Sequence, residues 1–525
     1  MDFNRIKLIF NTVKYLKFEQ IYYRVLYTLR NRFVNKKYNQ QLKINVVPIL
    51  WSDTIEKTTS YFGNLQFRFL NITHKFEEKI DWNYNEYGKL WTYNLNYFDF
   101  LNQSAIEQSE AFLLIQDYVE RSDELKDGLE PYPTSLRGIN WIKYLSKEQI
   151  KDEVINTSLY NQYLRLLDHL EYHILGNHLL ENGFSLLFGA YYFKDEMFYL
   201  KAKDILEKEL KEQILDDGAH FELSPMYHQI ILERLLDCFW LIKLNNWKQD
   251  LDFISSLNSY SIRIVGWLNK VTFRDGNIPM VNDSTYGIAS NTSNLTKYSK
   301  KLNIDSLDVK LSDSGYRKFK NKLYELFIDV GKIGPSYQPG HAHADTFSFI
   351  LHTSEPVIVD PGISTYNIGK ARDSERATIN HNTVSIENKN SSQVWSGFRV
   401  GNRANVILIK DTNESLIAEH DGYKNINSSH KREFFIKKSE INIRDTINKS
   451  LKGKASFHFH PNVEIEMNLL SQEIIFNTGK ISFKGSIKIE KFHYDYSQGF
   501  NKKIKATKIE VSFIGSLESK INLKI

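Results

Sequence analysis

The sequence predicts an α+β multidomain protein in which a helical first half is followed by an antiparallel β-sandwich. Between about residues 156 and 273, apolar residues recur every three or four positions, which is the spacing of amphipathic helices. After about residue 312, short alternating or β-branched runs dominate, as they do in strands. With 525 residues the chain is also too long for one ordinary core, so two large domains are expected.

The helical region contains five apolar-periodic segments, each long enough to be one arm of a helical hairpin. They cover residues 159–174, 179–193, 199–214, 230–244 and 257–271. Short polar breaks separate these segments, so consecutive helices are expected to run antiparallel. Successive hairpins of this size can close into an (α/α) toroid.

The second half contains at least nine strand-like runs separated by turn residues. They cover residues 323–330, 346–351, 357–359, 383–386, 405–409, 432–436, 456–460, 480–492 and 508–514. A single sheet of that many strands would curl or split, so two packed sheets are expected. The change from helix to strand assigns residues 46–310 to the helical domain and 311–525 to the β-domain, with the polar stretch 290–301 as the hinge.

Residues 1–45 form a separate basic segment with large apolar residues between its charges. Within residues 1–40, Asp2 and Glu19 are the acidic residues. Such a basic amphipathic stretch is expected either to lie on an anionic membrane or a partner, or to pack as a helix on the main domain. Its basic residues are Arg5, Lys7, Lys14, Lys17, Arg24, Arg30, Arg32, Lys36 and Lys37.

The same segment predicts no cleavable export signal. Lys14 and Lys17 interrupt the apolar run that begins at Leu8 before it reaches signal-peptide length, and no small-residue cleavage site follows. The expected location is therefore the cytoplasm or the inner face of the cytoplasmic membrane.

Composition and charge exclude several classes of protein. Apolar residues make up 42% and charged residues 25%, which fits neither a disordered chain nor a multi-span membrane protein. A net charge of +5 favours an acidic partner, but no phosphate-binding loop, zinc-finger spacing or nucleic-acid recognition signature is present. The single cysteine, Cys238, excludes an intrachain disulfide framework.

Two histidines in the string GHAHAD, His341 and His343, form the densest chemical motif. Alternation along an extended backbone places both imidazoles on one side. Two histidines at this spacing commonly serve one metal, or one binds metal while the other transfers a proton. The alternative is a pair of hydrogen-bonded surface histidines.

Two later strings add further ligand types to this motif. Asp360, in VDPG, ends an apolar strand, and His381, in NHNTV, precedes another. Histidine and aspartate together suit a zinc-like ion that keeps a fourth position open or water-filled. Alternatively, Asp360 caps the turn before Pro361 and His381 is a loop hydrogen-bonder.

The helical half contributes polar residues at two predicted helix starts. Asn177 and His178 lie in GNHLLENG, where they could hydrogen-bond a substrate carboxylate or, for Asn177, simply cap a helix. Tyr227 follows Pro225, which occupies a favoured first-turn position. Taken alone, Tyr227 would be a core aromatic.

These strings, read in order, resemble the heparinase II/III superfamily of polysaccharide lyases, including its alginate-lyase relatives. The strings are GNHLLENG, DDGAHFELSPMYH, GHAHADTFSF, VDPG and NHNTV, and the upstream YPTSLR and NW also resemble the N-terminal helical region of the family. The resemblance is clear over roughly residues 80 to 400. It implies an incomplete (α/α) toroid joined to an antiparallel β-sandwich, and cleavage of a uronic-acid-containing polysaccharide by β-elimination.

The resemblance also implies roles for individual residues. Asn177, with His178, matches the position that neutralises the uronate carboxylate. Tyr227 matches the Brønsted acid, with the base left open between it and His341, which matches the catalytic histidine. Such a Tyr/His pair divides acid and base work, while polar donors stabilise the enediolate that forms when the C5 proton leaves.

The metal site implied by the resemblance consists of His343, Asp360 and His381. The expected ion is divalent, with zinc ahead of calcium or manganese. Elimination needs no metal-activated water, so the ion is expected to be mainly structural and to orient His341 by way of His343.

A further set of residues is predicted to line sugar subsites, although each also fits a packing or surface role. These residues are Arg137, Asn140, Trp141, His228, Tyr366, Arg376 and Trp395.

Two rival functions stay open. A glycoside hydrolase on the same toroid would need two carboxylates flanking the bond, and Asp216, Asp217, Glu222 and Asp283 are available. A non-catalytic glycan-binding or assembly protein for surface polysaccharide would keep the fold but would not need a proton-transfer pair.

Overall fold

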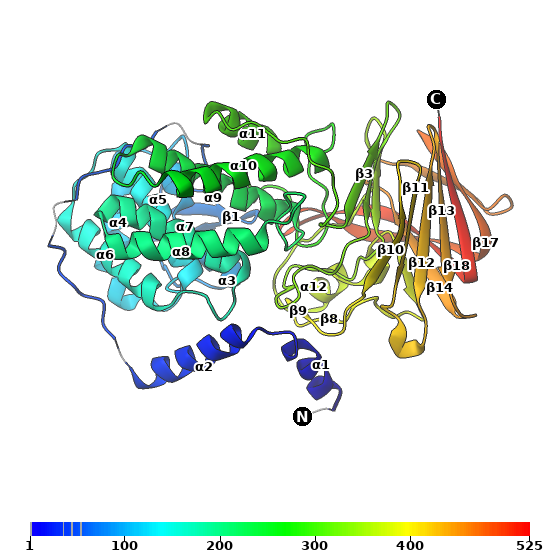
Figure 1. The fold of residues 1–525 in the computed structure, drawn as a ribbon, viewed down its shortest axis with the longest axis horizontal. Helices are drawn as coiled ribbons and strands as arrows, with labels where there is room; N and C mark the ends of the chain where they lie inside the picture. The colour runs from blue at the N-terminus through cyan, green and yellow to red at the C-terminus, as the bar shows by residue number, and fades with distance from the viewer. Residues whose placement is uncertain (1–2, 35, 44–45, 53–54, 525) are drawn as a thin grey trace.

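The computed structural model consists of a helical half joined to a β-sheet half (Figure 1). It describes residues 3–34, 36–43, 46–52 and 55–524. Residues 1–2, 35, 44–45, 53–54 and 525 belong to the three predicted segments but lie outside the described residues. The predicted order of a helical toroid followed by an antiparallel sandwich is confirmed.

The helical half contains nine of the described α-helices, after two N-terminal helices that lie along one side of the molecule (Figure 1). The N-terminal pair is α1 (Phe3–Val13) and α2 (Phe18–Phe33). The others are α3 (Lys89–Tyr97), α4 (Gln108–Glu120), α5 (Pro131–Lys147), α6 (Glu153–Asp168), α7 (Gly176–Phe193), α8 (Glu196–Gln213), α9 (Pro225–Leu244), α10 (Leu251–Val271) and α11 (Thr292–Lys301).

Local capping explains where the central helices begin. The side chain of Ser224 accepts a hydrogen bond from the backbone N–H of Tyr227, and Pro225 occupies the first position of α9. Asp195 and Asp250 cap α8 and α10 in the same way. These caps satisfy N–H groups that have no partner inside a helix.

Small residues let the toroid helices approach closely. The ring of Tyr163 on α6 lies against Gly138 of α5 and Gly189 of α7. A Cβ atom at Gly138 would lie 2.7 Å from Tyr163 Oη, and one at Gly189 would lie 2.6 Å from Tyr163 Cε1. The fit of these three helices therefore depends on glycine at both positions.

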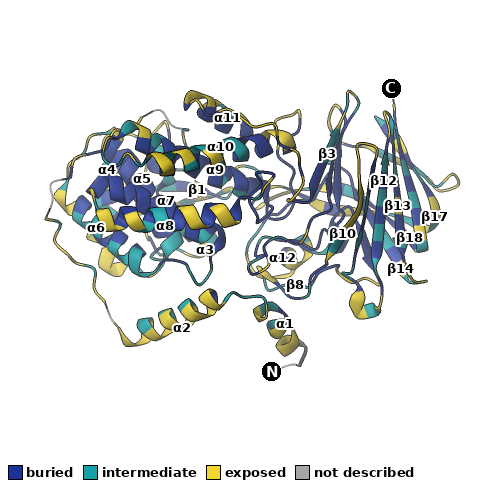
Figure 2. Ribbon diagram, viewed as in Figure 1, coloured by how far each residue is buried: buried dark blue, intermediate teal, exposed yellow. Residues whose placement is uncertain are grey.

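The β half consists of two sheets that enclose a common apolar core. The four-stranded sheet has the order β3-β4-β5-β6, and the ten-stranded sheet runs β10-β11-β12-β13-β18-β17-β16-β15, with β14 pairing both β18 and β7. Leu326 and Leu351 of the smaller sheet pack in one cluster with Ile443 and Val511 of the larger sheet. Figure 2 shows buried residues along the strands.

The bounds of the strands agree with most of the predicted runs. The elements are β3 (Tyr316–Lys320), β4 (Glu325–Asp329), β5 (Phe349–His352), β6 (Pro356–Ile358), α12 (Lys370–Glu375), β7 (Val384–Ile386), β8 (Val394–Trp395), β9 (Arg399–Val400), β10 (Val406–Asp411), β11 (Ser415–His420), β12 (His430–Ile436), β13 (Glu440–Ile447), β14 (Lys452–His458), β15 (Ile465–Asn468), β16 (Glu473–Phe476), β17 (Gly479–Gly499) and β18 (Lys502–Leu523).

The predicted runs omit seven strands of the β half, which are β3, β8, β9, β11, β13, β15 and β16. Two further features of the strands were not predicted. A small hairpin of β1 (Gln66–Phe69) and β2 (Ile72–Lys75) belongs to the helical half. Strands β17 and β18 are also much longer than the runs 480–492 and 508–514. Much of β17 between residues 484 and 493 is exposed or half-buried, so its sequence lacks the clean alternation that marks a strand with one buried face.

Candidate functional site

The chemical motifs of both halves converge where the helical half meets the β half. Asn177 is the second residue of α7, Tyr227 is the third residue of α9, and His341 lies in the loop between β4 and β5. Asn177 Nδ2 lies 3.4 Å from His341 Nε2, and the rings of Tyr227 and His341 are 4.0 Å apart. Three residues far apart in the sequence thus form one site.

Asn177 is held in place by Glu222, a residue of the loop before α9. The Asn177 side chain donates from Nδ2 to Glu222 Oε2 at 2.7 Å, and its backbone N–H donates to Oε1 at 2.9 Å. Gly176 permits this approach, because it has φ +63° and a Cβ atom there would lie 2.5 Å from Oε1. Asn177 Oδ1 is buried and has no hydrogen-bond partner among the described residues.

His341 is anchored through one ring nitrogen and has the other facing the site. Its Nδ1 lies 3.0 Å from Asp283 Oδ2, and its Nε2 lies 3.5 Å from Glu222 Oε2. Arg372 donates to both oxygens of Asp283, at 2.5 and 2.6 Å. Burial alone would raise the pKa of Asp283, but the charge of Arg372 and the hydrogen bonds from His341 and His343 hold it well below its usual value.

The hydroxyl of Tyr227 lies beside a second tyrosine. Its oxygen is 3.2 Å from that of Tyr366, and the ring of Tyr366 lies near the guanidinium of Arg372. Burial, together with Tyr366 and the charge of Asp283, raises the pKa of Tyr227 well above 10. Tyr227 is therefore a neutral phenol at neutral pH and can donate a proton.

His178 adds an imidazole next to Asn177. Its Nδ1 lies 3.0 Å from Glu171 Oε1, and its ring lies 4.7 Å from that of Tyr132. Burial lowers the pKa of His178, but the charge and hydrogen bond of Glu171 outweigh burial, so the pKa is raised. The side chain is 35% exposed, so it can reach a ligand.

The residues predicted to bind metal lie directly behind His341. His343 Nε2 lies 2.9 Å from Asp283 Oδ1, so one carboxylate contacts both histidines of the GHAHAD string. His381 Nδ1 lies 2.8 Å from Asp360 Oδ2, and the rings of His343 and His381 are 5.2 Å apart. These four side chains are buried.

Two nitrogen atoms of this group fit the predicted metal. His343 Nδ1 and His381 Nε2 are buried without a hydrogen-bond partner, as is Asp345 Oδ2. Such atoms are what a bound ion would satisfy. Among the described residues, however, no three His, Cys, Asp or Glu side chains are arranged to hold an ion together, and Asp360 is hydrogen-bonded to His381 instead. The metal site stays a prediction.

Four of the predicted subsite residues lie inside the helical core. Arg137, Asn140, Trp141 and His228 are at most 1% exposed. Arg137 donates to the backbone carbonyl of residue 128, and Asn140 donates to that of residue 97. Burial lowers the pKa of His228 to about 3, and its ring lies 2.9 Å from the backbone carbonyl of residue 264. Side chains without exposed surface cannot contact a polymer, so these four residues do not form a sugar subsite on the surface.

The three subsite residues predicted in the β half lie in different surroundings. Arg376 is buried and donates to the backbone carbonyls of residues 342 and 397. Trp395 is half-buried and donates to Thr12 of α1 at 3.2 Å. Only Tyr366 reaches the site, through its contact with Tyr227.

Four functional neighbours of the site were not assigned their roles from the sequence. The sequence offers Glu222 and Asp283 only as hydrolase carboxylates, and no motif marks Arg372 or Glu171. Glu222 lies in the same string as Tyr227, and this proximity in the sequence is the only local pattern that could have indicated its role at the site. Arg372 reaches Asp283 across 89 positions of the chain, and no local pattern predicts such a pairing.

The carboxylates considered for a hydrolase do not form an available pair. Asp216 is 98% exposed, whereas Asp217 is buried and accepts hydrogen bonds from the backbone at residues 312 and 314. Glu222 and Asp283 are engaged by Asn177 and Arg372, respectively. Asp217, Glu222 and Asp283 are thus each occupied by hydrogen bonds from neighbouring groups.

Two family models match consecutive parts of the chain. The model described as Heparinase II/III N-terminus matches residues 135–307, and the model described as Heparinase II/III-like, C-terminal matches residues 304–524. Among curated proteins, the chain is 26% identical over 317 residues to a heparin-sulfate lyase of Bacteroides stercoris, covering 55% of this chain and 46% of that one. It is 24% identical over 266 residues to a heparin-sulfate lyase of Pedobacter heparinus, covering 44% and 39%. The matched region thus spans less than half the length of these relatives.

Solved structures share the fold over a larger part of the chain. A crystal structure of heparinase III superposes with a TM-score of 0.67 at 16% identity, covering 95% of this chain and 89% of that one. A heparan sulfate lyase mutant from Pedobacter heparinus gives a TM-score of 0.60 at 16% identity, covering 88% and 82%.

Proposed function

Because this chain belongs to the heparinase II/III family, we propose that it is a polysaccharide lyase that cleaves a uronic-acid-containing polysaccharide by β-elimination. The observation that carries the proposal is the His341 ring, which is anchored by Asp283 and lies 4.0 Å from the ring of a neutral Tyr227. The curated relatives are named heparin-sulfate lyases, so heparin and heparan sulfate are the first substrates to test.

In this proposal His341 is the general base. Asp283 lies beside Nδ1 and favours the tautomer that carries its proton there, which leaves the lone pair of Nε2 free. Nε2 faces Asn177 and Glu222 across the site. It takes the C5 proton of the uronate while the C4–C5 double bond forms.

Tyr227 is the general acid. The C4–O bond breaks as the double bond forms, and the departing oxygen takes the phenolic proton of Tyr227. Because the pKa of Tyr227 is raised, the phenol stays protonated until negative charge develops on the leaving oxygen. Between turnovers, the proton gained by His341 returns to the phenolate of Tyr227 through water.

The C5 proton becomes acidic only when the uronate carboxylate is neutralised. The imidazolium of His178 and the side chain of Asn177 lie together at the N-terminus of α7, whose partial positive charge also favours an anion. Donors placed before the reaction stabilise the developing enediolate at no cost in reorganisation. We assign carboxylate binding to this helix end.

The proposal includes a divalent metal, with zinc expected ahead of calcium or manganese, held by His343, Asp360 and His381. When bound, the ion supplies a structural anchor for the loops that carry His343 and His381. Its support is the pair of unpartnered imidazole nitrogens.

Equilibrium dialysis against zinc is expected to show one bound ion for the wild type and none for His343→Ala/His381→Ala. The half-buried His460→Ala serves as the control, and zinc retained by the double variant would contradict the assignment.

The lyase assignment is tested by near-ultraviolet absorbance during incubation with heparin, heparan sulfate, hyaluronan, chondroitin and alginate. Only elimination leaves a conjugated C4–C5 double bond. Tyr227→Phe and His341→Ala are each expected to lower kcat by about 10²–10⁴-fold. Chain shortening without absorbance would instead indicate hydrolysis, and binding without turnover in any polymer would favour the non-catalytic alternative.

A further inference from the structure

Helix α2 attaches to the protein through its polar and tyrosine-rich face. Gln20 Nε2 donates to the backbone carbonyl of residue 174 at 3.0 Å, and Tyr27 Oη donates to that of residue 170 at 2.7 Å. Tyr23 stacks on Tyr172, with ring centroids 4.6 Å apart. The segment between α6 and α7 thus receives the face of α2 that amphipathic helices usually turn toward water.

The aliphatic and aromatic face of α2 consequently points away from the protein. Its members recur at three- and four-residue spacing, so they form one stripe along the helix. Phe18 is 82% and Phe33 is 74% exposed. The stripe consists of Phe18, Ile21, Tyr22, Val25, Leu29 and Phe33.

Helix α1 repeats this arrangement on the β half. Thr12 accepts a hydrogen bond from Trp395 Nε1 at 3.2 Å, and the buried Asn11 contacts Gln393. Ile6, Phe10 and Val13 are exposed on the other side of the helix. Figures 1 and 2 show both helices along one side of the molecule, with exposed residues on them. We call these three residues of α1, together with the stripe of α2, the apolar face.

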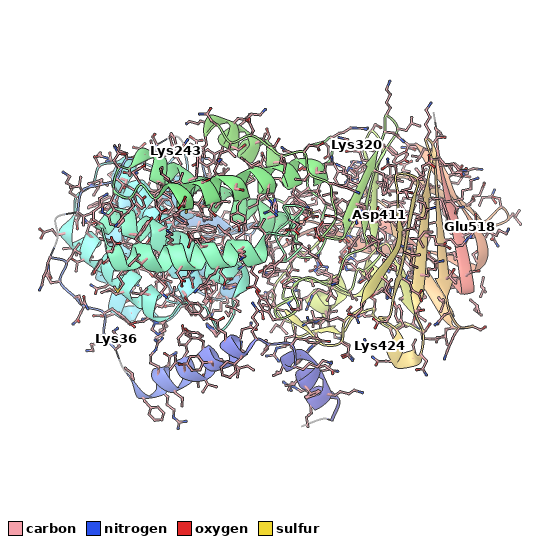
Figure 3. The ribbon with its side chains drawn as sticks, viewed as in Figure 1. Lys36, Lys243, Lys320, Asp411, Lys424 and Glu518 are labelled. Atoms are coloured by element: carbon pink, nitrogen blue, oxygen red, sulfur yellow. The ribbon has the colours of Figure 1, made fainter. Side chains whose placement is uncertain are left out.

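Basic residues surround the apolar face. Lys17 and Lys36 pair with Glu212 and Asp168 of the helical half. The labelled Lys36 marks the outer end of α2 in Figure 3. None of the exposed Arg5, Lys7, Arg32 and Lys37 forms an ion pair with another described residue. These cations are available to an external anionic surface.

We propose that α1 and α2 form a membrane-binding face that lies in the headgroup region of an anionic lipid bilayer. Apolar side chains on one face of a helix with basic flanks are the features of helices that lie in the plane of the interface. None of the described helices combines the length and the hydropathy needed to cross a bilayer.

Charge favours a lipid surface over a second copy of this chain. In a two-fold dimer the same patch meets itself, so the basic residues of one α1–α2 pair would face those of the other. Glu19 is the only acidic residue among the described residues 3–34 and 36–40 and could not offset them. Anionic headgroups supply the opposite charge while the acyl chains accept the apolar stripe.

The membrane-binding face and the candidate site share one structural element. Trp395, which contacts α1, belongs to β8, and Phe398 in the turn before β9 lies 6.1 Å from the ring of His341. Binding through α1 and α2 therefore fixes the short β8–β9 ribbon relative to the bilayer.

The test is co-sedimentation of the purified full chain with vesicles of phosphatidylcholine, with and without phosphatidylglycerol. The wild type is expected to sediment with the anionic vesicles and to be released by high salt. Val25→Glu/Leu29→Glu is expected to lower the partition coefficient by about 10-fold or more. Arg32→Gln/Lys37→Gln is expected to lower it by about fivefold for each charge removed.

Matched controls separate membrane binding from misfolding. Leu200→Glu/Leu251→Glu places the same charges at exposed apolar positions of α8 and α10 and is expected to bind vesicles as the wild type does. Circular dichroism and the thermal unfolding midpoint should agree among all variants. A wild type that ignores anionic vesicles, or a Val25→Glu/Leu29→Glu variant that binds equally well, would overturn the proposal. A dimer abolished by that variant, without vesicle binding, would overturn it and assign the face to a second copy.

Discussion

Asp283 is a fully buried carboxylate that contacts three side chains capable of carrying positive charge. Arg372 binds both of its oxygens, and His341 and His343 each approach one of them. The residue therefore fixes the ring of the proposed base and links it to the buried His343 behind the site. It touches no substrate in the proposal, so it is a positioning residue.

Asp283→Asn is expected to lower kcat by about 100-fold or more while changing KM little, because the amide leaves one acceptor oxygen for three donors and no longer fixes the tautomer of His341. The unfolding free energy should also fall, since Arg372 is left buried without a carboxylate, which costs about 3–5 kcal/mol. Absorbance assays and urea unfolding measure the two effects. Asp216→Asn removes an exposed carboxylate and should change neither. A normal kcat in a folded Asp283→Asn protein would refute the positioning role.

In the proposed mechanism, His178 is expected to give the reaction a pH dependence on the basic side. Its pKa is raised, so the imidazolium is present below that pKa and is lost as pH rises through it. kcat/KM is therefore expected to fall at high pH. Glu171→Gln removes the main cause of the rise, so the fall should begin at lower pH, as initial rates across a pH series would show. Identical profiles for the wild type and Glu171→Gln would remove the charge of His178 from the mechanism.

At the scale of secondary-structure elements, the close packing of α5, α6 and α7 around Tyr163 depends on two glycines. Gly138 and Gly189 belong to α5 and α7, which also supplies Asn177 at its start. A shift of α7 would move Asn177 and with it the proposed carboxylate-binding end of the site. Close packing and site geometry are thus coupled through one helix.

Gly189→Ala is expected to destabilise the protein by about 1–3 kcal/mol, because the added methyl group would lie 2.6 Å from a carbon of the Tyr163 ring. Urea unfolding followed by circular dichroism measures the change. Gly369→Ala is the control, since a Cβ atom there meets nothing within 4 Å and φ is extended. Equal stability of the two variants would show that Tyr163 moves aside freely.

At the scale of the whole molecule, a buried ion pair connects the layers of the sandwich. Arg432 of β12 binds Asp445 of β13 through two hydrogen bonds of 2.7 and 3.0 Å. The same guanidinium donates to the backbone carbonyls of residues 347 and 382, which precede β5 and β7. In Figure 3, the labelled Asp411 marks the edge strand of the same sheet, where Arg317 of the smaller sheet pairs with it.

Asp445 makes stability depend on pH in the acidic range. Burial raises its pKa, but Arg432 and His430 outweigh burial and lower it from 3.8 to about 2. A depressed pKa contributes stability above 3.8 that is lost as pH falls toward 2, and this contribution is about 2 kcal/mol. The difference in unfolding free energy between wild type and Asp445→Asn is expected to shrink by that amount over this range. A difference independent of pH would contradict the lowered pKa.

The sequence alone determined the order of the two halves, five of the described helices and half of the described strands, because a period of 3.6 or 2 in apolar residues is a local property of the chain. The segment 230–244 lies within α9, and the run 383–386 contains β7. Sequence motifs that resemble the heparinase II/III superfamily also assigned Asn177, Tyr227 and His341 to one site. The structure brings these three residues together.

Only the tertiary structure decided which residues support that site and which are buried. Arg137 and Arg376 are predicted from the sequence to line sugar subsites, yet their hydrogen bonds to distant carbonyls place them in the core. Asp283 reaches His341 across 58 positions and Arg372 across 89. Sequence patterns report which face of an element is apolar, whereas such pairings depend on how elements far apart in the chain pack against one another.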